Sequence, residues 1–165
     1  MGPPANPLKP LDRSEAAFWH SLMRALVVVP RVLDEDLDEA ERLSVNQYEI
    51  LMFLSEADGR QMRIGDLAES TSLTISGITR LVNRLAADGL VERRRCEDDG
   101  RGFYAVLTER GFDRLERAYP THLASARRQV MDHLTGFDLD ALARAFMHFG
   151  SERYSVFSRR SPSPE

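Results

Sequence analysis

Hydroxyl, amide and guanidinium side chains recur on one side of a stretch that is expected to form a helix, residues 75–87. Such groups hydrogen-bond the base edges and phosphates of duplex DNA. Apolar residues fill the other positions at the spacing of an amphipathic helix, which predicts that they pack inward. The polar residues are Ser76, Thr79, Arg80, Asn83 and Arg84, and the residues expected to face inward are Ile75, Ile78, Leu81, Val82, Leu85 and Ala86.

Both ends of this helix carry sequence signals. Thr74 is a suitable N-cap, because its hydroxyl can accept a hydrogen bond from a free N–H of the first turn. Gly77 removes a side chain near the helix start, where backbone would approach a ligand. Gly89 suits the left-handed position that ends a helix. Thr74 and Gly77 therefore join the candidate DNA-contacting residues.

A β-hairpin is predicted after the helix. Residues 90–96 and 103–107 are rich in branched and aromatic side chains, and they flank a segment of aspartates and glycines that favours a turn. Arg101 lies at the predicted tip. Arginines at 93–95 follow one strand, so alternate members face opposite sides. One side can meet phosphate, and the other is expected to rest on protein or pair with an acid.

Other elements must position this helix and hairpin. A short helix is predicted over residues 63–70, with a turn at 71–73, so residues 63–111 read as helix, turn, helix, hairpin and the start of another helix. That order is typical of a winged helix-turn-helix. Upstream, Ser44 and Gln47 form a capping box that opens a further helix, which is expected to stop at Asp58-Gly59.

Long helices are predicted on either side of this segment. The first is expected to start at Ser14 as N-cap, with Pro30 kinking or breaking it, and residues 34–41 are expected to form a solvated acidic face without function. After the hairpin, Thr108 is expected to cap a long helix that continues through Val130 and Leu134. Pro120 is expected to kink that helix, and Asp138 to cap the last one, whose apolar stripe is Leu142, Phe146, Phe149, Tyr154 and Phe157.

A set of residues in this segment forms a recognisable signature: Leu67-Ala68, Leu85, Gly89-Leu90-Val91, Arg93, and the wing motif Asp99-x-Arg101 followed by Leu107-Thr108-x-x-Gly111. With these residues the chain resembles the MarR family of bacterial transcriptional regulators, over about residues 14–157. The resemblance implies a homodimer in which the first helix and the last two helices interlock with a second subunit. It also implies that Arg101 reaches the DNA minor groove while Asp99 orients it.

The expected fold class is mainly α with a small β-hairpin, a winged helix-turn-helix domain plus a helical dimerisation region. At 165 residues and 42% hydrophobic content, the chain can bury one core. One MarR-like domain is expected over residues 13–157, with the winged helix-turn-helix at about 44–108 and dimerisation helices at about 14–42 and 109–157. Residues 1–12 are expected to be a flexible arm, and 158–165 a disordered tail.

The expected function is sequence-specific binding of double-stranded DNA at an inverted repeat, as a repressor relieved by an effector. The resemblance implies that this effector is a small aromatic or phenolic compound held between the dimerisation region and the DNA-binding lobe. Its candidate binding residues form an aromatic and methionine stripe of a kind that is more often simply core. They are Trp19, His20, Met23 and Tyr48.

Several function classes are disfavoured. A net charge of −4 argues against nonspecific coating of nucleic acid, so the DNA-binding prediction rests on pattern. No catalytic motif is recognisable, and neither a cofactor nor a metal is expected. Cys96 is expected to be an ordinary strand residue rather than a redox sensor. No signal peptide or membrane-length apolar run is expected, which favours a soluble cytoplasmic protein. A winged helix that binds a protein instead of DNA is the alternative.

Overall fold

The computed structural model describes residues 9–71, 73–95 and 102–149, and all structural statements concern those residues. Six α-helices and three β-strands form in that part of the chain, with short 3₁₀ turns at Asp58–Arg60 and Met131–Leu134. The helices are α1 (Arg13–Glu41), α2 (Val45–Glu56), α3 (Ile64–Ser70), α4 (Ile75–Ala87), α5 (Glu109–Gln129) and α6 (Leu139–Met147). The strands are β1 (Gln61–Arg63), β2 (Val91–Arg95) and β3 (Phe103–Leu107).

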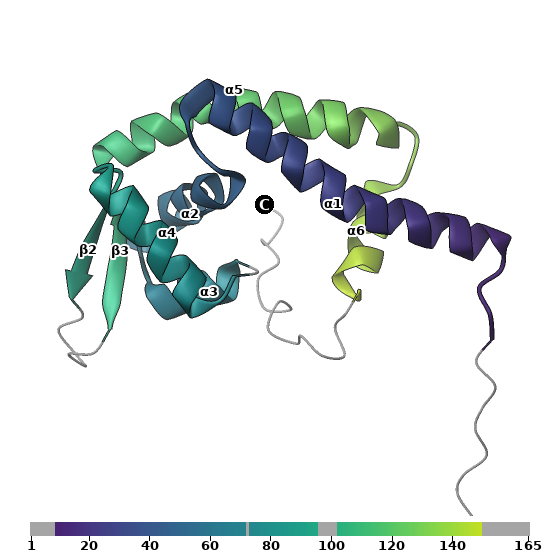
Figure 1. Ribbon diagram of the computed structural model, residues 1–165, viewed down its shortest axis with the longest axis horizontal. Helices are drawn as coiled ribbons and strands as arrows, with labels where there is room; N and C mark the ends of the chain where they lie inside the picture. The colour runs from purple at the N-terminus through teal and green to yellow at the C-terminus, as the bar shows by residue number, and fades with distance from the viewer. Residues whose placement is uncertain (1–8, 72, 96–101, 150–165) are drawn as a thin grey trace, which may run out of the picture.

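The molecule has a helical base and a smaller lobe beneath it. The two longest helices, α1 and α5, pack against each other and form the base (Figure 1). The helices α2, α3 and α4 and the hairpin β2–β3 lie under one end of the base, while α6 lies toward the other end. This arrangement confirms the expected fold class, which combines a winged helix-turn-helix with a helical region.

Local capping signals place the helix ends where the sequence predicts them. The Thr74 hydroxyl accepts from the Gly77 N–H at 3.2 Å and starts α4. Ser44 and Gln47 form both bonds of the predicted capping box of α2. Gly89 follows α4 with a φ of +69°, a conformation in which glycine pays no steric penalty. The caps of α5 and α6 are also confirmed, at Thr108 and Asp138.

The first helix differs from its prediction at both the start and the middle. Its N-cap is Asp12 rather than Ser14, and the Asp12 carboxylate accepts from the backbone N–H of Ser14 and Glu15. Pro30 does not break the helix, which runs unbroken from Arg13 to Glu41. Proline removes one backbone donor, and on this exposed stretch water can bond the carbonyl that is left. Of the two alternatives predicted at Pro30, a kink or a break, the break does not occur.

The structure also differs from the sequence prediction in the sheet and at the end of α5. A third strand, β1, pairs antiparallel with β3, so the strand order is β1-β3-β2 rather than a lone hairpin. The helix α5 ends at Gln129, because Val130 leaves helical geometry with φ −134° and ψ −62°. Leu134 therefore lies in a 3₁₀ turn rather than in the long helix. Cys96, predicted to end the first strand, and residues 97–101 of the predicted turn at 97–102, with Asp99 and Arg101, lie outside the described residues. The aromatic residues Tyr154 and Phe157 also lie outside them.

One hydrophobic core joins the lobe to the base. Leu37 of α1 and Ala118 of α5 are fully buried and belong to the same cluster as the buried side chains of the lobe. The lobe is therefore fixed to the base by packing at this end. Its buried members include Leu51, Leu54, Leu67, Ile78, Val82, Leu85, Leu90 and Val91.

The acidic segment at the end of α1 holds three elements together. Asp34 accepts from the backbone N–H of Val45 at the start of α2, at 2.8 Å. Asp36 accepts from the buried Ser125 hydroxyl at 2.5 Å and from Arg128 at 2.6 Å, both on α5. Charged hydrogen bonds to a buried partner stabilise more than exposed ion pairs do. The prediction of a merely solvated face at residues 34–41 was therefore wrong.

Within the described residues, α1 is long and apolar enough to cross a membrane, judged by length and composition alone. Its best 18-residue window has a mean hydropathy of 1.3. The expectation that no apolar run approaches the length of a membrane span was therefore wrong. Length and composition alone are weak evidence for a span, and α1 packs along α5 in this fold.

Candidate nucleic-acid interface

Helix α4 separates its side chains into a buried face and an exposed face. Ile78, Val82 and Leu85 are fully buried in the core. The opposite face is exposed at Ser76, Arg80, Asn83 and Arg84, whereas Thr79 is half-buried at its margin. The predicted periodicity is confirmed for these positions, and the core fixes which side of α4 is available for DNA.

Ile75 is the exception, because its side chain is 64% exposed rather than directed into the core. It is the first residue of α4, directly after the N-cap Thr74. The core covers the apolar side of α4 from Ile78 onward but does not reach its first residue. Helical periodicity alone therefore predicted the wrong environment for the Ile75 side chain. An exposed large aliphatic side chain therefore stands among the polar residues of the candidate interface.

The hydroxyl groups of the first two turns already have partners within the helix. The Thr74 and Ser76 hydroxyl oxygens lie 3.1 Å apart, and Thr74 also accepts from Gly77. Thr79 donates to the carbonyl oxygen of Ile75 at 2.8 Å. A Cβ added at Gly77 would lie 3.3 Å from the Thr74 hydroxyl, so this glycine leaves room for the cap. These four residues shape the start of the helix, and their role in contacting DNA stays a prediction.

Asn83 connects α4 to the hairpin. Its amide oxygen accepts from the Arg93 guanidinium on β2 at 2.9 Å, and that guanidinium also stacks on the Phe103 ring at 4.3 Å. A stacked and hydrogen-bonded guanidinium holds its position, since two interactions fix its plane. The contact fixes the hairpin relative to the helix, a role for Asn83 and Arg93 that the helix pattern alone did not reveal.

The remaining arginines differ in whether protein groups already hold them. Arg94 donates to the Gln61 side chain on β1 at 3.3 Å, so both Arg93 and Arg94 rest on protein. Within the described residues, the side chains of Arg80, Arg84 and Arg95 form no hydrogen bond or ion pair, and all three residues are exposed. Three guanidinium groups on α4 and β2 are therefore available for phosphates or base edges.

The candidate effector-binding residues are not brought together within one chain. Tyr48 is 3% exposed and stacks on His122 of α5, with ring centroids 4.3 Å apart. Trp19, His20 and Met23 instead lie on the exposed N-terminal half of α1. At a rise of ~1.5 Å per residue, Trp19 is roughly 27 Å along the helix from Leu37, the α1 residue in the core. The three α1 residues thus line no site with Tyr48 in a single subunit.

Burial alters the ionisation of the stacked pair. It lowers the pKa of the His122 imidazole, and it raises the pKa of the Tyr48 hydroxyl, with Tyr119 and Glu56 acting in the same direction. Both shifts favour the neutral forms, as expected where α2 packs on α5. The stack therefore joins the lobe to the base through two uncharged rings.

The His122 shift makes stability depend on pH. Because its pKa is lower in the folded chain, the unfolded chain binds more protons, and stability should fall as the pH drops below about 6.5. A His122→Phe variant keeps a ring against Tyr48 and cannot be protonated there, so its stability should fall less. Urea unfolding of both proteins at several pH values from about 7.5 down to about 5.5 measures the difference. Parallel curves would contradict the assignment.

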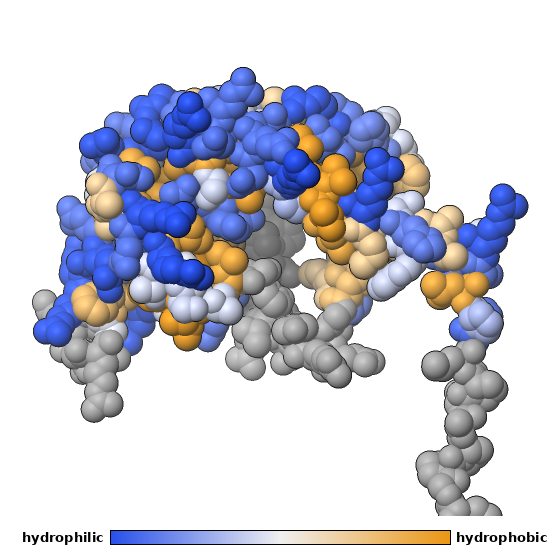
Figure 2. Space-filling model, in the orientation of Figure 1, coloured by the Kyte–Doolittle hydropathy of each residue, from blue (hydrophilic) through white to orange (hydrophobic). Residues whose placement is uncertain are grey.

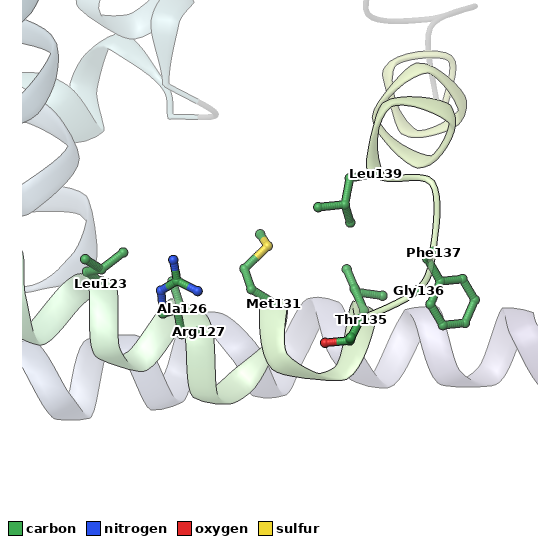
Figure 3. A pocket seen from close by; sticks show the side chains of 9 residues that line it. Leu123, Ala126, Arg127, Met131, Thr135, Gly136, Phe137 and Leu139 are labelled. Carbon is green, nitrogen blue, oxygen red and sulfur yellow. The ribbon is translucent and has the colours of Figure 1, made fainter.

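A pocket opens at the far end of the base, where α5 gives way to α6. It has a volume of about 490 Å³, and its lining includes Leu123, Met131, Phe137 and Leu139. Figure 3 shows Met131 and Leu139 on facing sides of this space. All four side chains are at least 40% exposed, so the pocket presents a largely apolar surface to solvent.

The described residues contain no cluster of three or more His, Cys, Asp or Glu side chains that could hold a metal ion. The arrangement of side chains instead suits contact with a polyanion, through α4 and the adjacent strand β2.

Comparison with known proteins agrees with this geometry. The sequence profile of the MarR family matches residues 43–102. The HTH-type transcriptional repressor YetL of Bacillus subtilis (strain 168) is 33% identical over 115 residues, which cover 70% of this chain and 68% of YetL.

Two solved structures from Streptomyces coelicolor share the fold over most of both chains. Sco3205, a MarR family transcriptional regulator solved in complex with DNA, has a TM-score of 0.83 and 28% identity, covering 89% of this chain and 92% of that one. AbsC, also a MarR family transcriptional regulator, has a TM-score of 0.80 and 34% identity, covering 88% and 97%. The chain therefore belongs to the MarR family of DNA-binding transcriptional regulators, which are not enzymes.

Proposed function

We propose that this regulator is a repressor that binds an inverted-repeat operator as a homodimer and leaves it when a small effector binds. The observation that carries the proposal is the exposed face of α4, where Arg80 and Arg84 are free of protein partners within the described residues. The bond from Arg93 to Asn83 sets the hairpin beside that face. The proposed DNA contacts are Thr74, Ser76, Gly77, Thr79, Arg80, Asn83 and Arg84, with Asp99 and Arg101 at the hairpin tip.

The homodimer is supported by the apolar surface of the base. On the face shown in Figure 2, apolar residues gather along the N-terminal half of α1 and over α6, whereas the ridge of α5 is largely hydrophilic. Large apolar patches on a soluble chain usually mark a protein interface. The exposed residues are Phe18, Trp19, Leu26, Val27 and Val28 before the lobe, and Leu123, Met131, Phe137, Leu139, Phe146, Met147 and Phe149 after it.

Repression and effector control have separate support. The relative YetL is named a repressor, and we extend that activity to this chain. The effector is proposed to be an aromatic or phenolic compound, bound near Trp19, His20, Met23 and Tyr48 where two subunits and the lobe meet. It can change DNA affinity only by binding one arrangement of the lobes more tightly than the other, with a typical coupling of ~1–3 kcal/mol.

The proposed organisation follows from the same features. The winged helix-turn-helix spans about residues 44–108, and the dimerisation helices span about 14–42 and 109–157 within one domain at 13–157. We place the protein in the bacterial cytoplasm, where the chromosomal DNA lies.

Selection of DNA from a random pool tests the proposal. A homodimer should select an inverted repeat whose half-sites lie about 10 base pairs apart, centre to centre, because its two recognition helices enter the major groove one turn apart. Sedimentation equilibrium at micromolar concentration should give the mass of two chains. A monomer, or selection of a single unrepeated half-site, would contradict the proposal.

A further inference from the structure

Ile75 occupies the position on α4 where base contacts are expected, although it has no hydrogen-bonding group. In helix-turn-helix proteins the N-terminal residues of the recognition helix contact base edges in the major groove. Ile75 is the first residue of α4 and is 64% exposed. Side chains of a helix lean toward its N-terminus, so the Ile75 side chain extends toward the end that leads into the groove.

The groups around Ile75 leave the first turn more apolar than its sequence suggests. The Thr79 hydroxyl donates to the Ile75 carbonyl oxygen, and the Thr74 and Ser76 hydroxyls lie within hydrogen-bonding distance of each other. Thr79 is also one turn further along the same side of the helix. The Thr79 hydroxyl and one hydroxyl of the Thr74–Ser76 pair therefore donate within the chain, and the exposed aliphatic side chain of Ile75 stands beside them.

Among the four standard bases, only thymine carries an apolar group in the major groove. The C5-methyl of thymine is the apolar feature of the groove, and it distinguishes an A·T pair from its reverse and from both G·C pairs. Isoleucine is branched at Cβ and holds few rotamers, so little side-chain entropy is lost on contact. We propose that Ile75 reads the C5-methyl group of a thymine in each half-site, which would make it a specificity-determining residue of this regulator.

This inference rests on the proposed binding of a specific operator, and the experiment separates the two. The DNA selected from a random pool serves as the probe, with each thymine replaced in turn by deoxyuridine, which removes only the C5-methyl and keeps base pairing. Affinities are measured by fluorescence anisotropy for the full-length wild type and for Ile75→Ala. At the contacted thymine, the wild type should bind about fourfold more weakly to the uracil site, the effect expected for exposing one methyl group.

The Ile75→Ala variant should show no such penalty at that thymine, because its partner for the methyl is already gone. It should also unfold at the same temperature as the wild type, since the side chain is mostly exposed. Thr79→Ser is the matched control, because it removes the methyl group of the residue one turn further along the same side of the helix. In Thr79→Ser the uracil penalty should persist.

Each other outcome would overturn the assignment. Equal uracil penalties in the wild type and Ile75→Ala, or no penalty at any thymine, would exclude methyl reading by Ile75 while leaving operator binding intact. A penalty that disappears only in Thr79→Ser would assign the reading to Thr79. A wild type that selects no sequence at all would remove the proposed function together with this inference.

Discussion

Replacing Gly111 with alanine is expected to destabilise the protein by about 3 kcal/mol or more, because the added methyl group has no space. A Cβ at this position would lie 2.0 Å from the carbonyl oxygen of Leu90 and 2.8 Å from a methyl of Leu107. That carbonyl cannot easily move, since it accepts from both the backbone N–H and the hydroxyl of Thr108. Either α5 shifts away from the start of β2 or the hairpin distorts.

Chemical denaturation measures the loss, and Gly65→Ala is the matched control. Gly65 lies in α3, and a Cβ added there would meet nothing within 4 Å. Alanine is favoured over glycine in a helix by roughly 0.5–1 kcal/mol, so this variant should be as stable as the wild type or slightly more so. A Gly111→Ala protein within about 1 kcal/mol of the wild type would show that α5 and the hairpin tolerate separation.

The position of Gly111 gives a physical reason for one residue of the sequence signature. The resemblance to the family included this glycine as a fixed position, without a physical reason for it. The structure supplies the reason: Thr108 caps α5 by accepting from the Gly111 N–H at 3.0 Å, and its hydroxyl lies 2.9 Å from the carbonyl oxygen of Gly89. Cap, helix and hairpin thus meet at one point, where only a residue without a side chain fits.

Features set by neighbouring residues were predictable from the sequence. The N-caps Thr74, Ser44 and Thr108 each bond a backbone N–H three residues away, so the evidence for them lies within one turn. The buried face of α4 follows from spacing alone, because its central turns pack on a continuous core. These elements fix the position of the candidate interface, and they carried most of the functional prediction.

Features that depend on distant residues were missed. The strand β1 exists because Gln61–Arg63 pairs with β3, more than forty residues away, and three residues give little periodicity. Asp36 looked like part of a solvated run until α5 brought Ser125 and Arg128 beside it. The predicted burial of Ile75 was wrong for a related reason, because the burial of a side chain at a helix end depends on which other elements cover that turn. In each case the deciding contact is tertiary.

Replacing Arg80 with alanine is expected to cost roughly 1–3 kcal/mol of binding free energy at each half-site of the selected operator. Its guanidinium is exposed on α4 and forms no bond within the described part of the chain, so it is free to make a bidentate pair with guanine O6 and N7. Binding to random DNA should weaken less, because the bidentate pair forms only where a guanine lies opposite Arg80. Affinities for both DNAs at several salt concentrations measure the two effects.

Two further variants separate base reading from charge. Arg31→Ala removes the same charge from an exposed position on α1, where Arg31 pairs with Glu35, and it should leave both affinities nearly unchanged. Arg101→Ala should weaken selected and random DNA more evenly and reduce the slope of log affinity against log salt by about one unit, as expected for a minor-groove contact where base identity is poorly distinguished. If Arg101→Ala removed sequence preference while Arg80→Ala kept it, the hairpin would be the reading element and α4 the clamp.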